Sequence, residues 1–395
     1  MNLKNMFLRG TLLLTAAGII SRIMGFFYRI FLANTIGAEG MGIYQLIFPI
    51  YSVCFSLCVS GIETAISKLT AAKYALGKEK EASDTLKIGL FLTLTLSICC
   101  SLIIYHYAPQ IAEIFLKEPR CSGLLKILAF TIPFGTTQSC ICGYYFGIHK
   151  AAVPSMAQLI EQLFRMGCVF LLYKIHLTNQ MEISPALAVM GLVFGEFCSL
   201  LFTVTCFSFH PQKRLPLSLK NACIGLREIL SLSTPLTISR ICINLLASLE
   251  AALIPNALKA YGMNPSAALS IYGILNGMAL PFILFPNALT GSIALMLLPA
   301  VSESQASGEL NKLKTAIRKT FTFCILLGCL CLIFFLLFGN FLGKFIFSSS
   351  IAGSFLTVLA WICPFLYLNT TLNSVLNGLG KTNITFLLGI TGLFI

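Results

Sequence analysis

The sequence predicts an all-α, polytopic membrane protein. Of its 395 residues 57% are hydrophobic and 10% are charged, whereas a soluble domain carries roughly 25% charged residues. Apolar runs of about 20 residues, the length that crosses a bilayer as a helix, recur along most of the chain. The sequence lacks the alternating ten-residue segments of a transmembrane β-barrel. The chain therefore has too little polar surface for a soluble fold.

The apolar runs predict the membrane helices in chain order. They cover residues 10–32, 43–66, 86–107, 123–147, 152–174, 184–208, 230–254, 268–299, 319–340 and 351–376. A further run begins near Ile384 and stops at Ile395. That length is too short to cross a bilayer of about 30 Å, so we expect a chain truncated inside this helix. Pro281 and Pro286 predict a bend in the run 268–299.

Basic residues in the connecting segments predict the orientation. The formal net charge is +13, and most Lys and Arg outside the spans fall in segments that are cytoplasmic if the N-terminus is inside. This bias favours a cytoplasmic N-terminus. Lys4 and Arg9 before the first apolar run resemble a signal peptide, but Arg22 and Arg29 interrupt the run. We therefore expect an uncleaved first helix. No nucleic-acid-binding motif accompanies the positive charge.

A short repeat predicts an internal duplication. Ile20-Ser21-Arg22 in the first span recurs as Ile238-Ser239-Arg240 in the seventh. Ile43-Tyr44 in the second span similarly recurs as Ile271-Tyr272 in the eighth. An even number of spans separates the copies, so both have the same orientation, which predicts a parallel repeat related by an axis along the membrane normal.

The polar connection after the sixth span predicts the domain boundaries. It combines basic residues with interspersed leucines and isoleucines, a pattern typical of an amphipathic segment on the inner leaflet. We predict an N-terminal lobe over 1–208, an amphipathic cytoplasmic linker over 209–229, and a C-terminal lobe over 230–395 that is truncated in its fifth helix.

Three arginines within apolar spans are candidate substrate ligands. Arg22 and Arg240 lie about halfway through their spans, and Arg29 follows Arg22 by two helical turns on the same face. An arginine at the bilayer centre costs about 2.5–3.5 kcal/mol on insertion scales and is usually functional. A guanidinium binds phosphate bidentately. Arg22 and Arg240 on opposite lobes therefore predict a diphosphate clamp, whereas Arg29 either binds substrate or reaches the outer interface.

Four further charged residues lie within the spans, and their positions suggest structural or ion-binding roles. Glu161 and Arg165 have the i,i+4 spacing of a helical ion pair, which favours a structural role. Glu196 has no obvious partner and is a candidate proton or cation site. Glu250 either pairs with Arg29 or meets water at the interface.

Two polar amides within the spans are candidate sugar-binding groups. We expect Asn244 and Asn276 either to bind a sugar headgroup or to form hydrogen bonds between helices.

The sequence gives no support for enzymatic or cofactor chemistry. No P-loop motif occurs, and Asp84 is the one aspartate in the sequence. The 16 cysteines lie mostly in apolar segments without histidine partners at zinc spacing. We therefore expect no enzyme activity, no cofactor and no metal site.

The first 90 residues carry a family resemblance. The segments Ser21-Arg22-Ile23-Met24-Gly25-Phe26-Phe27-Tyr28-Arg29, Ile36-Gly37-Ala38-Glu39-Gly40-Met41-Gly42-Ile43-Tyr44-Gln45 and Gly61-Ile62-Glu63-Thr64-Ala65-Ile66-Ser67-Lys68 closely resemble the opening of the stage V sporulation protein B family. That family belongs to the polysaccharide-flippase branch of the multidrug/oligosaccharidyl-lipid/polysaccharide (MOP) exporter superfamily. The resemblance implies two pseudo-symmetric six-helix bundles around a central cavity, the second incomplete here, in a bacterial cytoplasmic membrane. It also implies that Arg22, and less directly Arg29, contacts a substrate diphosphate.

We therefore expect a flippase that moves an undecaprenyl-diphosphate-linked oligosaccharide or peptidoglycan precursor, similar to lipid II, by alternating access. Its partners would be this anionic lipid-linked sugar, the membrane lipids and cell-envelope synthases. One alternative is a cation-coupled multidrug exporter of the same superfamily, although the first span holds arginines and no acid. Another is a non-transporting scaffold in envelope or spore assembly.

Overall fold

In the computed structural model, the described chain consists of helices joined by short turns. The structure describes residues 3–209, 219–379 and 381–394, except 288, 292, 295–296, 298–300 and 302–309. Within these residues eight helices are long and apolar enough to cross a membrane. They are Leu13–Ala75, Glu79–Phe115, Cys121–Gly147, Ala186–Ser208, Ala222–Ala260, Pro265–Leu284, Ile317–Phe347 and Ser350–Asn377. The predicted all-α membrane fold is confirmed.

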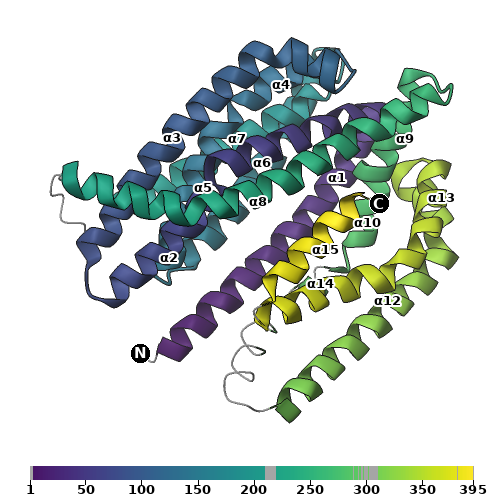
Figure 1. The fold of residues 1–395 in the computed structure, drawn as a ribbon. Helices are drawn as coiled ribbons and strands as arrows, with labels where there is room; N and C mark the ends of the chain where they lie inside the picture. Colours follow the sequence, from purple (N-terminus) through teal and green to yellow (C-terminus); the bar gives the residue numbers. More distant parts are fainter. Residues whose placement is uncertain are drawn as a thin grey trace. The chain divides into compact units, whose positions relative to one another are not determined.

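The packing of the helices divides the chain into two compact units. The first unit comprises Met1–Met24 and Ile43–Pro265, and the second comprises Gly25–Gly42 and Ser266–Ile395. Both units are drawn in Figure 1. The elements of the first unit include α1 (Leu3–Phe55), η1 (Ser56–Ser60), α2 (Gly61–Ala75), α3 (Glu79–Gln110), η2 (Ile111–Phe115), α4 (Cys121–Ala129), α5 (Thr131–Gly147), α6 (Ala152–Thr178), α7 (Ala186–Ser208) and α8 (Leu219–Ala260). Residues 25–42 of α1 belong to the second unit.

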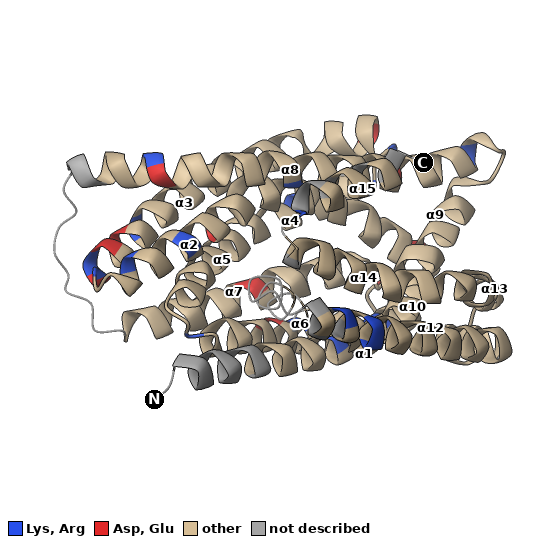
Figure 2. Cartoon of the chain, turned by 60° about the horizontal axis from the view of Figure 1, so that its bottom comes forward, with Lys and Arg blue, Asp and Glu red and all other residues tan. Residues whose placement is uncertain are grey.

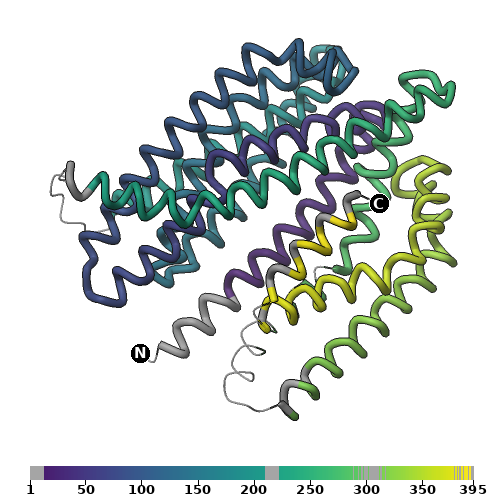
Figure 3. Tube along the Cα trace, viewed as in Figure 1, coloured from purple at the N-terminus to yellow at the C-terminus, as the bar shows by residue number. Residues whose placement is uncertain are grey.

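Helix α1 contains the first predicted span, 10–32, and the first part of the second, 43–66, which continues through η1 into α2. Its helical path is broken at Gly37, which has φ 71° and ψ 179°. Glycine adopts this conformation without the steric penalty that a side chain would add. Figure 3 shows the trace of α1 changing direction along its length. The predicted connection between the first two spans, residues 33–42, is therefore helical on both sides of Gly37.

The core of the first unit lies where α2, α3 and α5 pack together. Val59, Ile66, Leu86, Ile141 and Tyr145 are among its buried residues. The close approach of α3 depends on a glycine, because a Cβ at position 89 would lie 2.3 Å from the Cδ1 atom of Ile66. The close apolar packing of these three helices makes the region next to the polar cavity rigid.

The second unit contains the other helices whose bounds the structure describes. They are α9 (Pro265–Gly273), η3 (Ile274–Ala279), α10 (Leu280–Leu284), α12 (Leu310–Phe347), α13 (Ser350–Leu359), η4 (Ala360–Ile362), α14 (Cys363–Gly378) and α15 (Thr382–Phe394). Helix α10 ends two residues before Pro286, inside the span 268–299 in which the sequence predicts a bend. The buried phenol of Tyr367 joins α14 to α10 by donating a hydrogen bond of 2.7 Å to the carbonyl of Ile283.

The two compact units differ from the predicted lobes at α8. The predicted linker 209–229 lies partly outside the described residues, and its part from Leu219 onward forms the first turns of α8. Helix α8 packs on α2, α3 and η1 and so belongs to the first unit. Figure 2 shows few charged residues along the helices and a cluster of both signs around the turn between α2 and α3.

Candidate functional site: a polar cavity in the first unit

The first unit contains a polar cavity of about 410 Å³. Its walls come from α1, η1, α5, α6, α7 and α8, and they combine aromatic rings with groups that carry charge or donate hydrogen bonds. The polar side chains that line it include Tyr51, Gln138, Glu161, Arg165, Glu196 and Asn244. Of these, Glu161, Arg165, Glu196 and Asn244 are candidate site residues from the sequence, and the fold brings them together.

Glu161 and Arg165 form an ion pair one helical turn apart on α6. The Arg165 Nη2 atom donates a hydrogen bond to Glu161 Oε1, as their i,i+4 spacing predicts. Helix α7 approaches this pair closely, since a Cβ at Gly195 would lie 2.7 Å from the carbonyl oxygen of Glu161. The pair is therefore held against α7 at the cavity wall.

Glu196 of α7 is buried beside this pair. The hydroxyl of Tyr51 on α1 donates a hydrogen bond of 3.3 Å to Glu196 Oε1. Gly135 of α5 leaves room for both groups, because a Cβ there would lie 3.0 Å from Glu196 Oε2 and 3.0 Å from the Tyr51 oxygen. Tyr51 is thus a site residue that sequence reasoning missed. The available signal was a phenol in an apolar span, which usually needs a polar partner when buried.

Gln138 of α5 is the second site residue that sequence reasoning missed. Its Nε2 atom donates a hydrogen bond of 3.2 Å to the Ser199 hydroxyl, which in turn donates one of 3.0 Å to the carbonyl of Ala157. This chain of hydrogen bonds links α5, α7 and α6 next to the cavity. It stabilises the relative positions of the helices that carry Glu161 and Glu196.

The charges of the cavity suit a cation or a proton rather than a phosphate. Glu161 and Glu196 supply carboxyl groups, and Arg165 supplies the guanidinium that pairs with Glu161. With both carboxylates ionised, the three residues carry one net negative charge, which repels an anion in a poorly solvated space. Among the residues that the structure describes, no group of three His, Cys, Asp or Glu side chains is arranged to hold a metal ion.

Arg240 and Asn244 of α8 bind neighbouring protein groups. The Nη1 atom of Arg240 donates a hydrogen bond of 2.8 Å to the carbonyl of Ser60, and the guanidinium interacts electrostatically with Glu63. The amide of Asn244 donates to the Ser56 hydroxyl over 2.5 Å. The repeat predicts Arg240 and Arg22 on opposite lobes, whereas both belong to the first unit of the structure, in which α8 packs on α2 and η1.

The other predicted site residues lie outside this cavity. Arg22 and Arg29 are both exposed on α1. Within the described part of the chain, no hydrogen bond or ion pair involves Arg22. Glu250 is exposed near the end of α8, and Asn276 is half-buried in the π-helical segment η3 of the second unit.

Comparison with known proteins places the chain in a family. The model of a family described as "Polysaccharide biosynthesis protein" matches residues 7–305. The chain belongs to this family. Stage V sporulation protein B of Bacillus subtilis (strain 168) is 30% identical over 380 residues, which are 95% of this chain and 73% of that protein. The predicted resemblance to the stage V sporulation protein B family of the MOP superfamily is thereby confirmed.

Two further comparisons agree with a multi-pass membrane transporter of this superfamily. The Lipid II flippase MurJ of B. subtilis is 23% identical over 335 residues, covering 79% of this chain and 61% of that protein. A solved inward-facing multidrug resistance MATE family transporter of the MOP superfamily matches with a TM-score of 0.69 and 14% identity. That match covers 96% of this chain and 87% of the other and shows a shared fold.

Proposed function

We propose that this protein is a flippase that moves an undecaprenyl-diphosphate-linked oligosaccharide or peptidoglycan precursor by alternating access. The observation that carries the proposal is Arg22, an exposed guanidinium within an apolar helix that has no partner among the described residues. A permanently charged group in such a helix is costly unless a ligand or protein group compensates it. Membership of a polysaccharide biosynthesis family supports an anionic sugar lipid as that ligand.

The spacing of the arginines on the first helix suits a diphosphate. Arg22 and Arg29 are seven residues apart in the sequence, which corresponds to about two turns of a helix. Their guanidinium groups can bind phosphate oxygens bidentately while the polyprenyl tail stays in the bilayer. Arg22 is the principal ligand of this set, and Arg240 donates its Nη1 hydrogen bond to the Ser60 carbonyl.

Loop charge and membrane potential support a direction for transport. The excess of basic residues in predicted cytoplasmic segments favours a cytoplasmic N-terminus in the bacterial cytoplasmic membrane. An inside-negative potential favours the exit of an anion by about 2.3 kcal/mol per charge per 100 mV. A diphosphate headgroup that enters from the cytoplasm is therefore driven outward without ATP.

Arg22→Ala tests the proposal directly. We expect binding of an undecaprenyl-diphosphate lipid, measured by native mass spectrometry, to fall about tenfold or more, because a charge-assisted hydrogen-bonding partner is lost. Transport of the lipid precursor into proteoliposomes should fall with it. Arg227→Ala is the matched control, since Arg227 is an exposed arginine on α8. Unchanged binding and transport in Arg22→Ala would contradict the proposed ligand.

Within this proposal, Glu196 is the ion-coupling carboxylate. Its burial beside the Glu161–Arg165 pair and its hydrogen bond from Tyr51 support a group that gains and releases a cation or proton during the cycle. We expect Glu196→Gln to abolish the stimulation of transport by an imposed proton or sodium gradient while lipid binding persists. The exposed Glu182→Gln is the control. Gradient-driven transport at the original rate in Glu196→Gln would remove Glu196 from the coupling role.

A second candidate function is a cation-coupled multidrug exporter. The observation that favours it is the presence of two carboxyl groups, Glu161 and Glu196, in the first-unit cavity, where an organic cation would be attracted. Expression in a drug-sensitive host discriminates the two candidates. Resistance to organic cations that is lost in Glu196→Gln and retained in Arg22→Ala would favour the exporter.

A further inference from the structure

A row of backbone carbonyls on the second span receives side-chain donors. The span contains the π-helical turn η1, and such turns occur frequently at functional sites. The carbonyls of Ser52, Ser56 and Ser60, spaced by four residues, each accept a hydrogen bond from a side chain. Two of these donors come from α8, namely Asn244 at 3.4 Å to Ser52 and Arg240 at 2.8 Å to Ser60.

Helix α8 closely approaches the start of α2 beside this row. A Cβ at Gly61 would lie 2.1 Å from the hydroxyl oxygen of Thr237 and 2.5 Å from the carbonyl oxygen of Ser233. Gly61 follows directly on Ser60, and Thr237 precedes Arg240 by about one helical turn. The missing side chain at Gly61 therefore brings the Arg240 guanidinium within reach of the Ser60 carbonyl.

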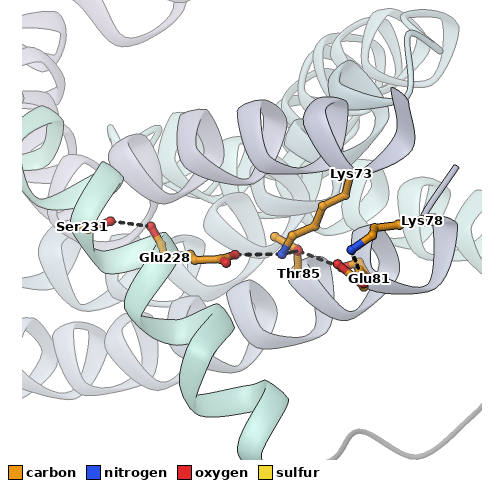
Figure 4. A network of polar contacts seen from close by, with 6 residues as sticks. All are labelled: Lys73, Lys78, Glu81, Thr85, Glu228 and Ser231. Carbon is orange, nitrogen blue, oxygen red and sulfur yellow. Dashed lines mark hydrogen bonds and ion pairs between the residues drawn. The ribbon is translucent and has the colours of Figure 1, made fainter. Parts of the chain in front are cut away.

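Polar contacts hold α8 against the rest of the first unit near both ends of the helix. Near its start, Glu228 binds the Lys73 ammonium over 2.9 Å, and that ammonium also donates to Thr85 over 3.0 Å (Figure 4). Near its other end, Lys259 donates to the carbonyl of Lys117 over 3.1 Å. The two attachments are about 46 Å apart along the helix, at 1.5 Å per residue. The bonds of Arg240 and Asn244 lie between them.

We propose that Arg240 is a positioning residue that holds α8 in register with η1. The hydrogen bond from Arg240 to Ser60 fixes the position of α8 along η1. One turn further along α8, the Asn244 amide then binds the Ser56 hydroxyl and lines the polar cavity. The Arg240 guanidinium also interacts electrostatically with the nearby Glu63. Arg240 thus shapes the cavity wall through Asn244, and this role holds whichever substrate the protein carries.

The accessibility of Ser248 on α8 reports whether this register is kept. Ser248 is one turn beyond Asn244 and is 2% exposed, whereas the native Cys223 near the start of the same helix is exposed. The experiment introduces Ser248→Cys into the full chain in lipid nanodiscs and follows its alkylation by N-ethylmaleimide with peptide mass spectrometry. Alkylation of Cys223 in the same sample provides the internal reference.

We expect Arg240→Met to raise the relative alkylation rate of the introduced thiol about tenfold, because losing the central hydrogen bond favours local opening of α8. Arg240→Lys should restore protection, since an ammonium can still donate to the Ser60 carbonyl. Arg227→Met is the matched control on α8 and should leave the rate unchanged. Asn244→Ala removes the hydrogen bond from the Asn244 amide to the Ser56 hydroxyl and should also raise the alkylation rate. This variant provides the test if Arg240→Met does not fold.

Two results would overturn the proposal. One is alkylation at the original rate in a monodisperse, helical Arg240→Met protein or in Asn244→Ala. The other is a loss of undecaprenyl-diphosphate binding in Arg240→Met with protection of the introduced thiol retained. That outcome would make Arg240 a substrate ligand, and it is distinguishable from failure of the Arg22 test because Arg22 is unchanged.

Discussion

Gly61→Ala is expected to destabilise the protein, although the substitution adds one methyl group. The added carbon would lie 2.1 Å from Thr237 Oγ1 and 2.5 Å from the backbone oxygen of Ser233. A hydroxyl can rotate away, but the Ser233 carbonyl belongs to the backbone of α8, so the helix itself must move. Overpacking of this kind typically costs about 1–3 kcal/mol. The measurement is the free energy of unfolding in detergent or the midpoint of thermal unfolding.

Gly167→Ala provides a control of opposite expected sign. Gly167 lies inside α6, and a Cβ there would meet no other atom within 4 Å. Alanine in a helix interior is favoured over glycine by about 0.5–1 kcal/mol. We therefore expect Gly167→Ala to be neutral or stabilising in the assay that shows Gly61→Ala to be destabilising. Equal stability of the two variants would contradict the close packing of α8 at Gly61.

Arg165→Met is expected to destabilise the first unit because it leaves Glu161 without its partner. The side chains of the pair are 16% and 21% exposed, so water screens them only partly. Removing one partner of a buried ion pair costs about 3–5 kcal/mol, and we expect the lower end of that range here. The free energy of unfolding measures the effect.

The double variant Glu161→Gln with Arg165→Met separates this cause from a loss of packing. It removes both charges and should recover most of the lost stability, because replacing both members of such a pair with neutral groups is often tolerated. Lys78→Met is a matched control at an exposed pair, since Lys78 and Glu81 are both more than half exposed and such pairs contribute about 0–1 kcal/mol. A double variant as unstable as Arg165→Met would show that the arginine acts through packing.

Helix positions were predictable from the sequence, and helix lengths were less so. The predicted span 184–208 corresponds closely to α7 at Ala186–Ser208. The predicted span 86–107 is shorter than α3, which begins at Glu79. The apolar run marks the part of a helix suited to hydrocarbon, whereas the polar first turns of α3 continue the same hydrogen-bonding pattern in water.

The candidate site residues were predictable where their contacts lie within one helix and not where they join distant segments. The Glu161–Arg165 pair follows from spacing along one helix, because residues four apart share a face. The Tyr51 partner of Glu196 lies 145 residues away in the chain, and no local pattern relates the two. Arg240 stands out in the sequence as a charge in an apolar span, but its bond to Ser60 depends on the glycine that lets α8 approach.

By itself, the sequence determined a multi-pass helical membrane protein, its main helices and the identity of the charged residues inside them. Those properties follow from hydropathy and from spacing within single helices, which are local. Only the tertiary structure decided that Glu161, Arg165, Glu196 and Asn244 line one cavity and that Arg240 binds a backbone carbonyl. These contacts depend on which helix faces pack together, and that packing is set by glycine contacts and π-helical turns between segments far apart in the chain.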